Sequence, residues 1–223
     1  MENKEQVSEN KNDVKTVGVG SVNQGTYGKI SASGVCTATG AITADEIKSA
    51  GVFTAKDIVS VGKIKTGGTA TFAKDLEATN ADFSGSCKIT GKLRAREVKI
   101  SGGFTAADVE AETVTASGNI HVSGEMNVGT LELCSPNTNI ATLHADTVKI
   151  AISKINWYPF RGVSVAKIGV AECTDFSAEG VRAEKVSCRN ATIGKYCRIK
   201  SLEYSGTLTM DPDAEVDEVT KAE

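Results

Sequence analysis

Six cysteines and two histidines are the residues of this 223-residue chain whose types could bind a metal or carry nucleophilic and acid–base chemistry. The cysteines lie at positions 36, 87, 134, 173, 188 and 197, and no two of them form a Cys-x-x-Cys pair. His121 and His144 lie far apart in the sequence, whereas the ligands of a zinc site are usually closely spaced. We therefore expect reduced, mostly buried thiols that pack as small apolar groups, with no metal, disulfide or cofactor.

Charged residues give little support to a nucleic-acid partner. The formal net charge is -3, so no overall basic field attracts nucleic acid. One stretch is locally basic, and its cations are Lys88, Lys92, Arg94, Arg96 and Lys99. No aromatic residues alternate with these cations, so we interpret the stretch as a solvated face.

A short aromatic segment is the clearest candidate for partner contact. Residues 154–162 include Trp157, Tyr158 and Phe160, and Trp157 is the only tryptophan of the chain. Pro159 indicates an irregular loop at this point. Two interpretations stay open: the aromatic side chains fold back over the side of the molecule, or they contact a partner or another subunit.

A repeat of 17 residues organises the chain that must position these groups. Glycines recur at this spacing at positions 34, 51, 68, 85 and 102, and the next one arrives one residue early at Gly118. Alignment on these glycines shows three short apolar pairs in each repeat, and the two members of a pair are two residues apart. In the first aligned repeat the pairs are Cys36/Ala38, Ile42/Ala44 and Ile47/Ser49.

A spacing of two is the period of a β-strand, and glycine, serine, aspartate and asparagine cluster between the pairs, as in turns. Amphipathic helices would instead place apolar residues at i, i+3, i+4 and i+7. The pattern predicts an all-β fold, a three-sided parallel β-helix (a β-solenoid) with about 17 residues per coil. Coils stacked roughly 4.8 Å apart bury the inward pairs between neighbours.

The repeat predicts three regions. Residues 1–16 are polar and are expected to form a disordered tail, residues 17–210 the solenoid of roughly eleven coils, and residues 211–223 an acidic tail or a short helix. Residues 1–15 lack the apolar stretch of a signal peptide, and no segment approaches the roughly 18 apolar residues of a membrane span. We expect a cytoplasmic protein.

An enzyme of the hexapeptide acyltransferase class is the main catalytic alternative. Residues 193–199, IGKYCRI, are hexapeptide-like, and such enzymes are left-handed β-helices with 18-residue coils that often use a histidine base. The dominant period of 17 is not a multiple of six. We expect both histidines to be solvated residues rather than general bases, and no nucleophile elbow or P-loop motif is present. The sequence therefore favours a protein that is not an enzyme.

Residues 91–102, GKLRAREVKISG, resemble the signature repeat of the bactofilins, and residues 40–51 and 118–124 fit the same pattern. The resemblance spans most of the repeat region. It implies a right-handed, three-sided β-helix that polymerises end to end into bacterial cytoskeletal filaments. It also implies contacts with other bactofilin-like proteins or envelope proteins, and at most peripheral association with the inner face of the cell membrane. The chain differs from the common form in its greater length, in the aromatic segment and in an N-terminal region without an apolar patch.

Edge pairing is the expected mechanism of assembly, because a solenoid end exposes unpaired strand groups and an apolar cross-section. We expect homopolymer contacts at the end coils. The candidate residues are Val17, Val19, Tyr27, Leu202, Tyr204, Leu208 and Met210. A non-polymerising adaptor that binds a partner through its flat faces and the Trp157 segment is the second hypothesis, and the acyltransferase is the third.

Overall fold

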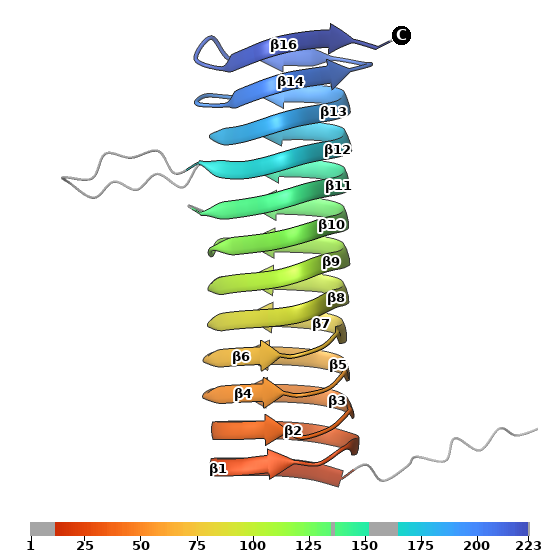
Figure 1. The fold of residues 1–223 in the computed structure, drawn as a ribbon, viewed down its shortest axis with the longest axis vertical. Coiled ribbons are helices and arrows are strands. Elements are labelled where there is room, and N and C mark those ends of the chain that lie inside the picture. The colour runs from red at the N-terminus through yellow and green to blue at the C-terminus, as the bar shows by residue number, and fades with distance from the viewer. Residues whose placement is uncertain (1–11, 135–136, 152–164, 223) are drawn as a thin grey trace, which may run out of the picture.

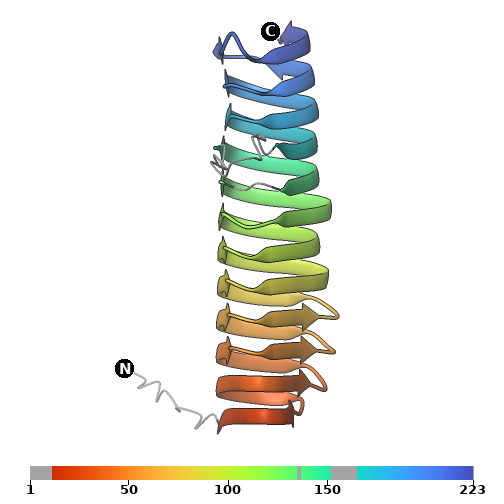
Figure 2. The same ribbon diagram turned by 90° about the vertical axis from the view of Figure 1, so that its left-hand side faces the viewer.

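The chain folds into one long stack of β-coils, as the repeat predicts (Figure 1). The structure is a computed structural model that describes residues 12–134, 137–151 and 165–222. These residues form a β-solenoid of about 11 turns with about 17 residues per coil, and they contain strands but no helix. The view turned by 90° shows the same single stack, with the first and last described strands at opposite ends (Figure 2).

The described residues form one 16-stranded sheet in which every strand pair is parallel. Several strands run around a corner and contribute to more than one side of a coil. The strands are β1 (Asn12–Val22), β2 (Gly25–Ala38), β3 (Ile42–Ser49), β4 (Val52–Ala55), β5 (Val59–Thr66), β6 (Thr69–Phe72), β7 (Leu76–Phe83), β8 (Ser86–Ile100), β9 (Gly103–Ala116), β10 (Ile120–Leu133), β11 (Thr138–Ile150), β12 (Ala166–Ala178), β13 (Val181–Ile193), β14 (Arg198–Tyr204), β15 (Leu208–Met210) and β16 (Glu215–Lys221).

Each coil has three inward-facing pairs, and we name the three sides after them. Face A carries the pair Cys36/Ala38, face B carries Ile42/Ala44 and face C carries Ile47/Ser49, and these six residues are buried. Strand register places the equivalent residues of neighbouring coils directly above one another. One such column on face C consists of Val14, Ile30, Ile47, Ile64, Ala81, Val98, Val114, Leu131, Val148, Phe176, Ala191 and Leu208.

The core is a thin column of aliphatic residues with a few aromatic rings. Phe53 and Phe72 lie with ring centroids 6.0 Å apart, and the rings of Phe83 and Phe104 stack at 5.6 Å. The four rings come from four different strands, β4, β6, β7 and β9, so each ring pair joins neighbouring coils as well as filling the interior. Burial of each such side chain contributes about 1.5–3 kcal/mol.

Glycine is required at the corner between faces C and A because successive coils approach closely there. A Cβ atom added to Gly102 would lie 1.9 Å from the carbonyl oxygen of Gly85, and one added to Gly85 would lie 1.8 Å from that of Gly68. Gly51 and Gly118 face the same obstacle, at 2.0 and 1.8 Å. The 17-residue glycine spacing therefore marks the corner at which one coil rests on the backbone of the coil before it.

Carboxylates stabilise another corner by accepting hydrogen bonds from the following coil. The Oδ1 atom of Asp75 accepts a hydrogen bond from the backbone N–H of Lys92 at 2.9 Å, and that of Asp108 accepts one from Glu125 at 2.8 Å. At the corner between faces B and C, Asp13 makes the same kind of contact with the N–H of Lys29. These aspartates accept hydrogen bonds from backbone N–H groups where the strand ladder is interrupted, so they stabilise the turns at the corners.

The solenoid extends beyond the boundaries 17–210 expected from the sequence. Strand β1 begins at Asn12, inside the expected tail of residues 1–16, and β16 (Glu215–Lys221) forms a further parallel strand within the expected acidic tail. The prediction of a loose tail or a short helix for residues 211–223 is therefore wrong for these positions. Val216 and Val219 stack on Ile199 and Leu202 of the coil before, although acidic side chains surround them.

Candidate functional site

The two ends of the stack are the places where the sheet is left incomplete. Strand β1 pairs only with β2, so its outer edge has no strand partner among the described residues. We call this coil, residues 12–28, the head end. Val17 is 70% exposed and Val19 is 87% exposed. Both lie on β1, but they stack on Ser33 and Val35 outside the inward columns, so their role in end contacts stays a prediction. Tyr27 is half-buried, and its hydroxyl donates a hydrogen bond to the carbonyl oxygen of Asn23 at 2.9 Å.

The opposite end, residues 208–222, is the tail end. Strand β16 lies on β14 and covers faces A and B, whereas nothing described covers β15 on face C. Met210 is 38% exposed and Leu208 is half-buried, so both are accessible from this end. Val219 of β16 is 47% exposed.

Two of the residues predicted at the tail end lie one coil too deep. Leu202 is fully buried, because Val219 stacks directly on it. Tyr204 is half-buried beneath Lys221. The expectation that Leu202 makes an end contact is wrong, since an additional coil covers it. Val216 and Val219 occupy the end positions instead, and the i, i+3 spacing they share with Ile199 and Leu202 is the signal that would have identified them.

The tail end is acidic. Residues 211–221 contain one basic residue, Lys221, and several acidic ones, which are Asp211, Asp213, Glu215, Asp217 and Glu218. Arg198 of the preceding coil pairs with Glu215, with Nε and Oε2 3.0 Å apart. The head strand β1 carries only Asp13 and Lys15. The two ends therefore differ in charge.

Three of the five cations in the basic stretch 88–99 pair with carboxylates of neighbouring coils. Arg94 lies between Glu77 and Glu110, at 3.6 and 3.4 Å, and Arg96 lies 3.4 Å from Glu112. Lys92 pairs with Glu110 at 2.5 Å, and these contacts hold the pKa of the Glu110 carboxyl below its usual value. Charges of opposite sign thus alternate up the face, which agrees with its interpretation as a solvated surface.

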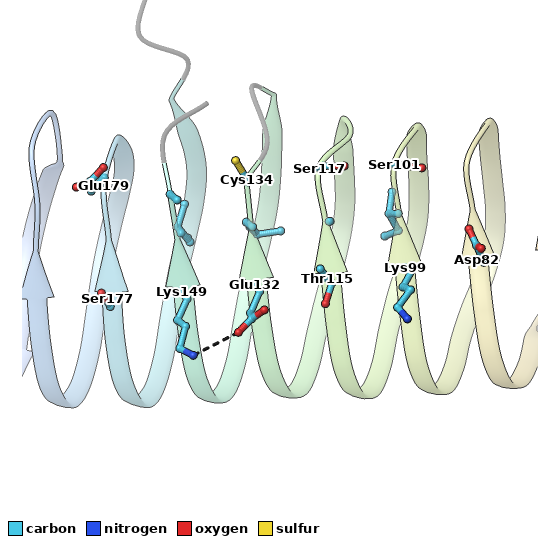
Figure 3. A pocket seen from close by; sticks show the side chains of 15 residues that line it. Asp82, Lys99, Ser101, Thr115, Ser117, Glu132, Cys134, Lys149, Ser177 and Glu179 are labelled. Atoms are coloured by element: carbon cyan, nitrogen blue, oxygen red, sulfur yellow. Dashed lines mark hydrogen bonds and ion pairs between the residues drawn. The ribbon is translucent and has the colours of Figure 1, made fainter. Parts of the chain in front are cut away.

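A groove of about 790 Å³ lies along the corner between faces C and A (Figure 3). Its apolar floor includes Ile100, Ala116, Leu133 and Ile150 from four successive coils, and Cys134 lies beside it. The rim carries Glu132 and Lys149, whose Oε1 and Nζ atoms are 3.3 Å apart. Cys134 is exposed, so it is the thiol most open to reagents among the six.

The remaining thiols lie in or beside the core. Cys36, Cys87 and Cys197 are buried, and the Sγ atom of Cys197 lies 3.3 Å from the carbonyl oxygen of Ala178. Cys173 and Cys188 are half-buried and stack on each other on face B. Burial raises the pKa of Cys173 to about 12 and that of Cys188 to about 11, so both are neutral thiols at ordinary pH. All six cysteines are free, and no group of three metal-ligating side chains occurs in the described parts of the chain.

The histidines lie on separate outer faces. His121 is exposed, beside a shallow groove of about 390 Å³ whose described lining holds no carboxylate that could orient the ring. Nδ1 of His144 lies 3.2 Å from Oε2 of Glu172 on face B. In the hexapeptide-like stretch, Tyr196 occupies a left-handed turn with φ of 60° and Cys197 points into the core. The structure brings neither histidine to this turn.

Trp157, Tyr158 and Phe160 lie outside the described residues, so the partner-contact prediction for them stays a prediction. In residues 12–134, 137–151 and 165–222 no helix is long and apolar enough to cross a membrane. Searches of family models, curated proteins and solved structures find no match to this chain.

Proposed function

We propose that the chain is a structural scaffold that assembles end to end into filaments. The observation that carries this proposal is the pair of uncovered ends: among the described residues β1 has one strand neighbour, and β15 and β16 have theirs only on the inner side. Unpaired strand edges bind other strands readily, and the head strand β1 carries only two charged residues, Asp13 and Lys15. Val14, Leu208 and Val216 pack against the core and extend it to these two surfaces.

Repeated contact between ends gives an open filament, because nothing in a straight stack requires the assembly to close. The resemblance to bactofilins supports the same function and a cytoplasmic location, with envelope proteins, or the inner face of the membrane, as sites of attachment. The alternating charges of the outer faces keep the sides of the rod solvated, which directs association to the ends.

Electron microscopy and light scattering of the purified protein test the proposal. We expect filaments whose length increases with protein concentration. Leu208→Arg places a charge on the uncovered face C and should shorten the filaments while the rod stays folded. Leu202→Arg is the matched contrast, because the same change at a fully buried position should unfold the last coils. Monomers at every concentration, with the native ends intact, would end the proposal.

A non-polymerising adaptor is the second candidate function, and the corner groove favours it. The groove has an apolar floor that spans several coils, as expected of a peptide-binding surface. Light scattering distinguishes the two functions, since an adaptor remains monomeric and its end variants do not change its mass.

A further inference from the structure

The two ends of the solenoid are in phase: the winding stops at the tail end at the same corner at which it starts at the head end. The inward columns that begin at Val14 on face C, Val22 on face A and Gly25 on face B end at Leu208, Val216 and Val219, and all three have the same number of members. Because a solenoid is one continuous winding, each end has a step, where the last strand stops and a strand of the adjacent coil is left uncovered. At the tail end the winding stops after face B, and no strand of the described residues covers β15 on face C. At the head end β1 starts on face C.

We infer that copies of this chain join head to tail, so that the filament has a polarity. This inference deepens the proposed function and rests on it. The step at one tail end accepts the first strand of the next copy without a gap: Val14 lies over Leu208, Thr16 over Met210, and Val22 over Val216. The three faces and their apolar columns then continue from one copy into the next in unbroken parallel register.

Contacts between like ends do not require this match. A joint with two-fold symmetry pairs head with head or tail with tail. The phase of the head relative to the tail then has no effect on the contact and can take any value. In-phase ends are therefore expected for a head-to-tail stack and have no role in a stack of alternating orientation.

Charge opposes one of the two joints that such an alternating stack needs. Tail-to-tail contact would bring together two copies of a coil in which Asp211, Asp213, Asp217 and Glu218 outnumber Lys221. Head-to-tail contact instead places the acidic tail coil against β1, whose charges are Asp13 and Lys15. Like charges held close together at an interface disfavour association, so the acidic tail selects the head.

Variants blocked at a single end distinguish the two arrangements. Val14→Lys blocks the head and Val219→Lys blocks the tail, because each puts a charge into an inward column at a half-covered position. Thr220→Lys is the matched control, since this neighbouring residue is exposed and lies in an outward column of β16. Analytical ultracentrifugation measures the mass of each variant alone and of equimolar mixtures, and circular dichroism checks that each is folded.

Head-to-tail assembly predicts that each blocked variant is monomeric alone, that the mixture forms dimers and no larger species, and that the control forms filaments. Dimers of either blocked variant alone would overturn the inference and would leave end-to-end assembly standing. Filaments formed by a blocked variant would overturn it as well. Absence of assembly by the unaltered protein is a separate outcome, which refutes the proposed function itself.

Cysteine crosslinking gives a second measurement that does not depend on the blocked variants. In a Cys134→Ser background, Lys15→Cys and Thr209→Cys lie in one outward column, which head-to-tail stacking continues across the joint. Neighbours in a column are about 4.8 Å apart, within the range for a disulfide. The mixture of the two single variants should crosslink under oxidation, and neither should crosslink alone. Crosslinking of Lys15→Cys with itself would refute the polarity.

Discussion

The corner glycines provide the sharpest test of how the coils pack. In Gly102→Ala the new Cβ would lie 1.9 Å from the oxygen and 2.7 Å from the carbonyl carbon of Gly85. Relief requires the two coils to separate locally by about 1 Å, which weakens adjacent backbone hydrogen bonds such as that from the N–H of Ser101 to the oxygen of Phe83 at 3.0 Å. Overpacking costs about 1–3 kcal/mol and each lost hydrogen bond about 0.5–1.5 kcal/mol, so we expect a loss of about 3 kcal/mol in the free energy of unfolding.

The neighbouring glycine is the control. A Cβ at Gly103 would meet nothing nearer than Oγ of Ser86 at 3.9 Å, and Gly103 is not among the glycines with positive φ. Gly103→Ala should therefore be neutral or stabilise by about 0.4–1 kcal/mol through the unfolded state. Thermal unfolding followed by circular dichroism should show a midpoint about 6–12 °C lower for Gly102→Ala. Equal midpoints for the two variants would refute the close approach of the coils at this corner.

Three further outcomes follow from the core and the thiols. Thr66→Val should raise the free energy of unfolding by about 1 kcal/mol in chemical denaturation, because the buried Thr66 hydroxyl has no hydrogen-bond partner among the described residues. Phe83→Ala should lower the free energy of unfolding by about 3–5 kcal/mol, and a smaller loss would mean that the coils close over the cavity. Cys134 should react with a thiol reagent in the native protein well before Cys173 and Cys188, and equal rates would contradict their burial. Stability should fall as the pH rises above 9.0, because thiols of the unfolded chain then lose protons, whereas Cys173 and Cys188 keep theirs in the fold up to pKa values of about 12 and about 11. Alkaline denaturation of the native protein and of a Cys173→Ala variant measures this effect. The same dependence of stability on pH in both proteins would refute it.

The interior of the solenoid could be predicted from the sequence because each inward position is covered on both sides. A residue such as Ile47 or Ile64 packs against the coil above and the coil below, so polar replacements there are costly and the pairs repeat clearly. The glycine period was equally visible, since it marks close contact between backbones. Three buried hydroxyls at inward positions, on Ser49, Thr66 and Thr138, are the exceptions, and we have no physical account of them.

The ends could be predicted less well because an end coil is covered on one side only. Outward residues of β16 are acidic, and they make it hard to recognise in the sequence the spacing of three that places Val216 and Val219 over Ile199 and Leu202. The same lack of cover hid the start of β1, where Thr16 and Gly20 occupy inward positions. The phase of one end relative to the other depends on the register of every strand pair between them, so it becomes known only when all of these pairs are known.

The side chains of the end coils support assembly independently of their phase. An end coil that always faces water gains little from apolar residues in its inward columns, and polar ones would protect it from unwanted pairing. Val14, Leu208, Val216 and Val219 nevertheless occupy these columns, partly exposed in the single chain. If they serve assembly, Val219→Thr should leave the stability of the monomer almost unchanged while it raises the protein concentration at which filaments appear, because the burial lost is that of the joint. A matched loss of monomer stability, measured by chemical denaturation below the assembly threshold, would show that Val219 serves the fold of one copy and not the contact between two.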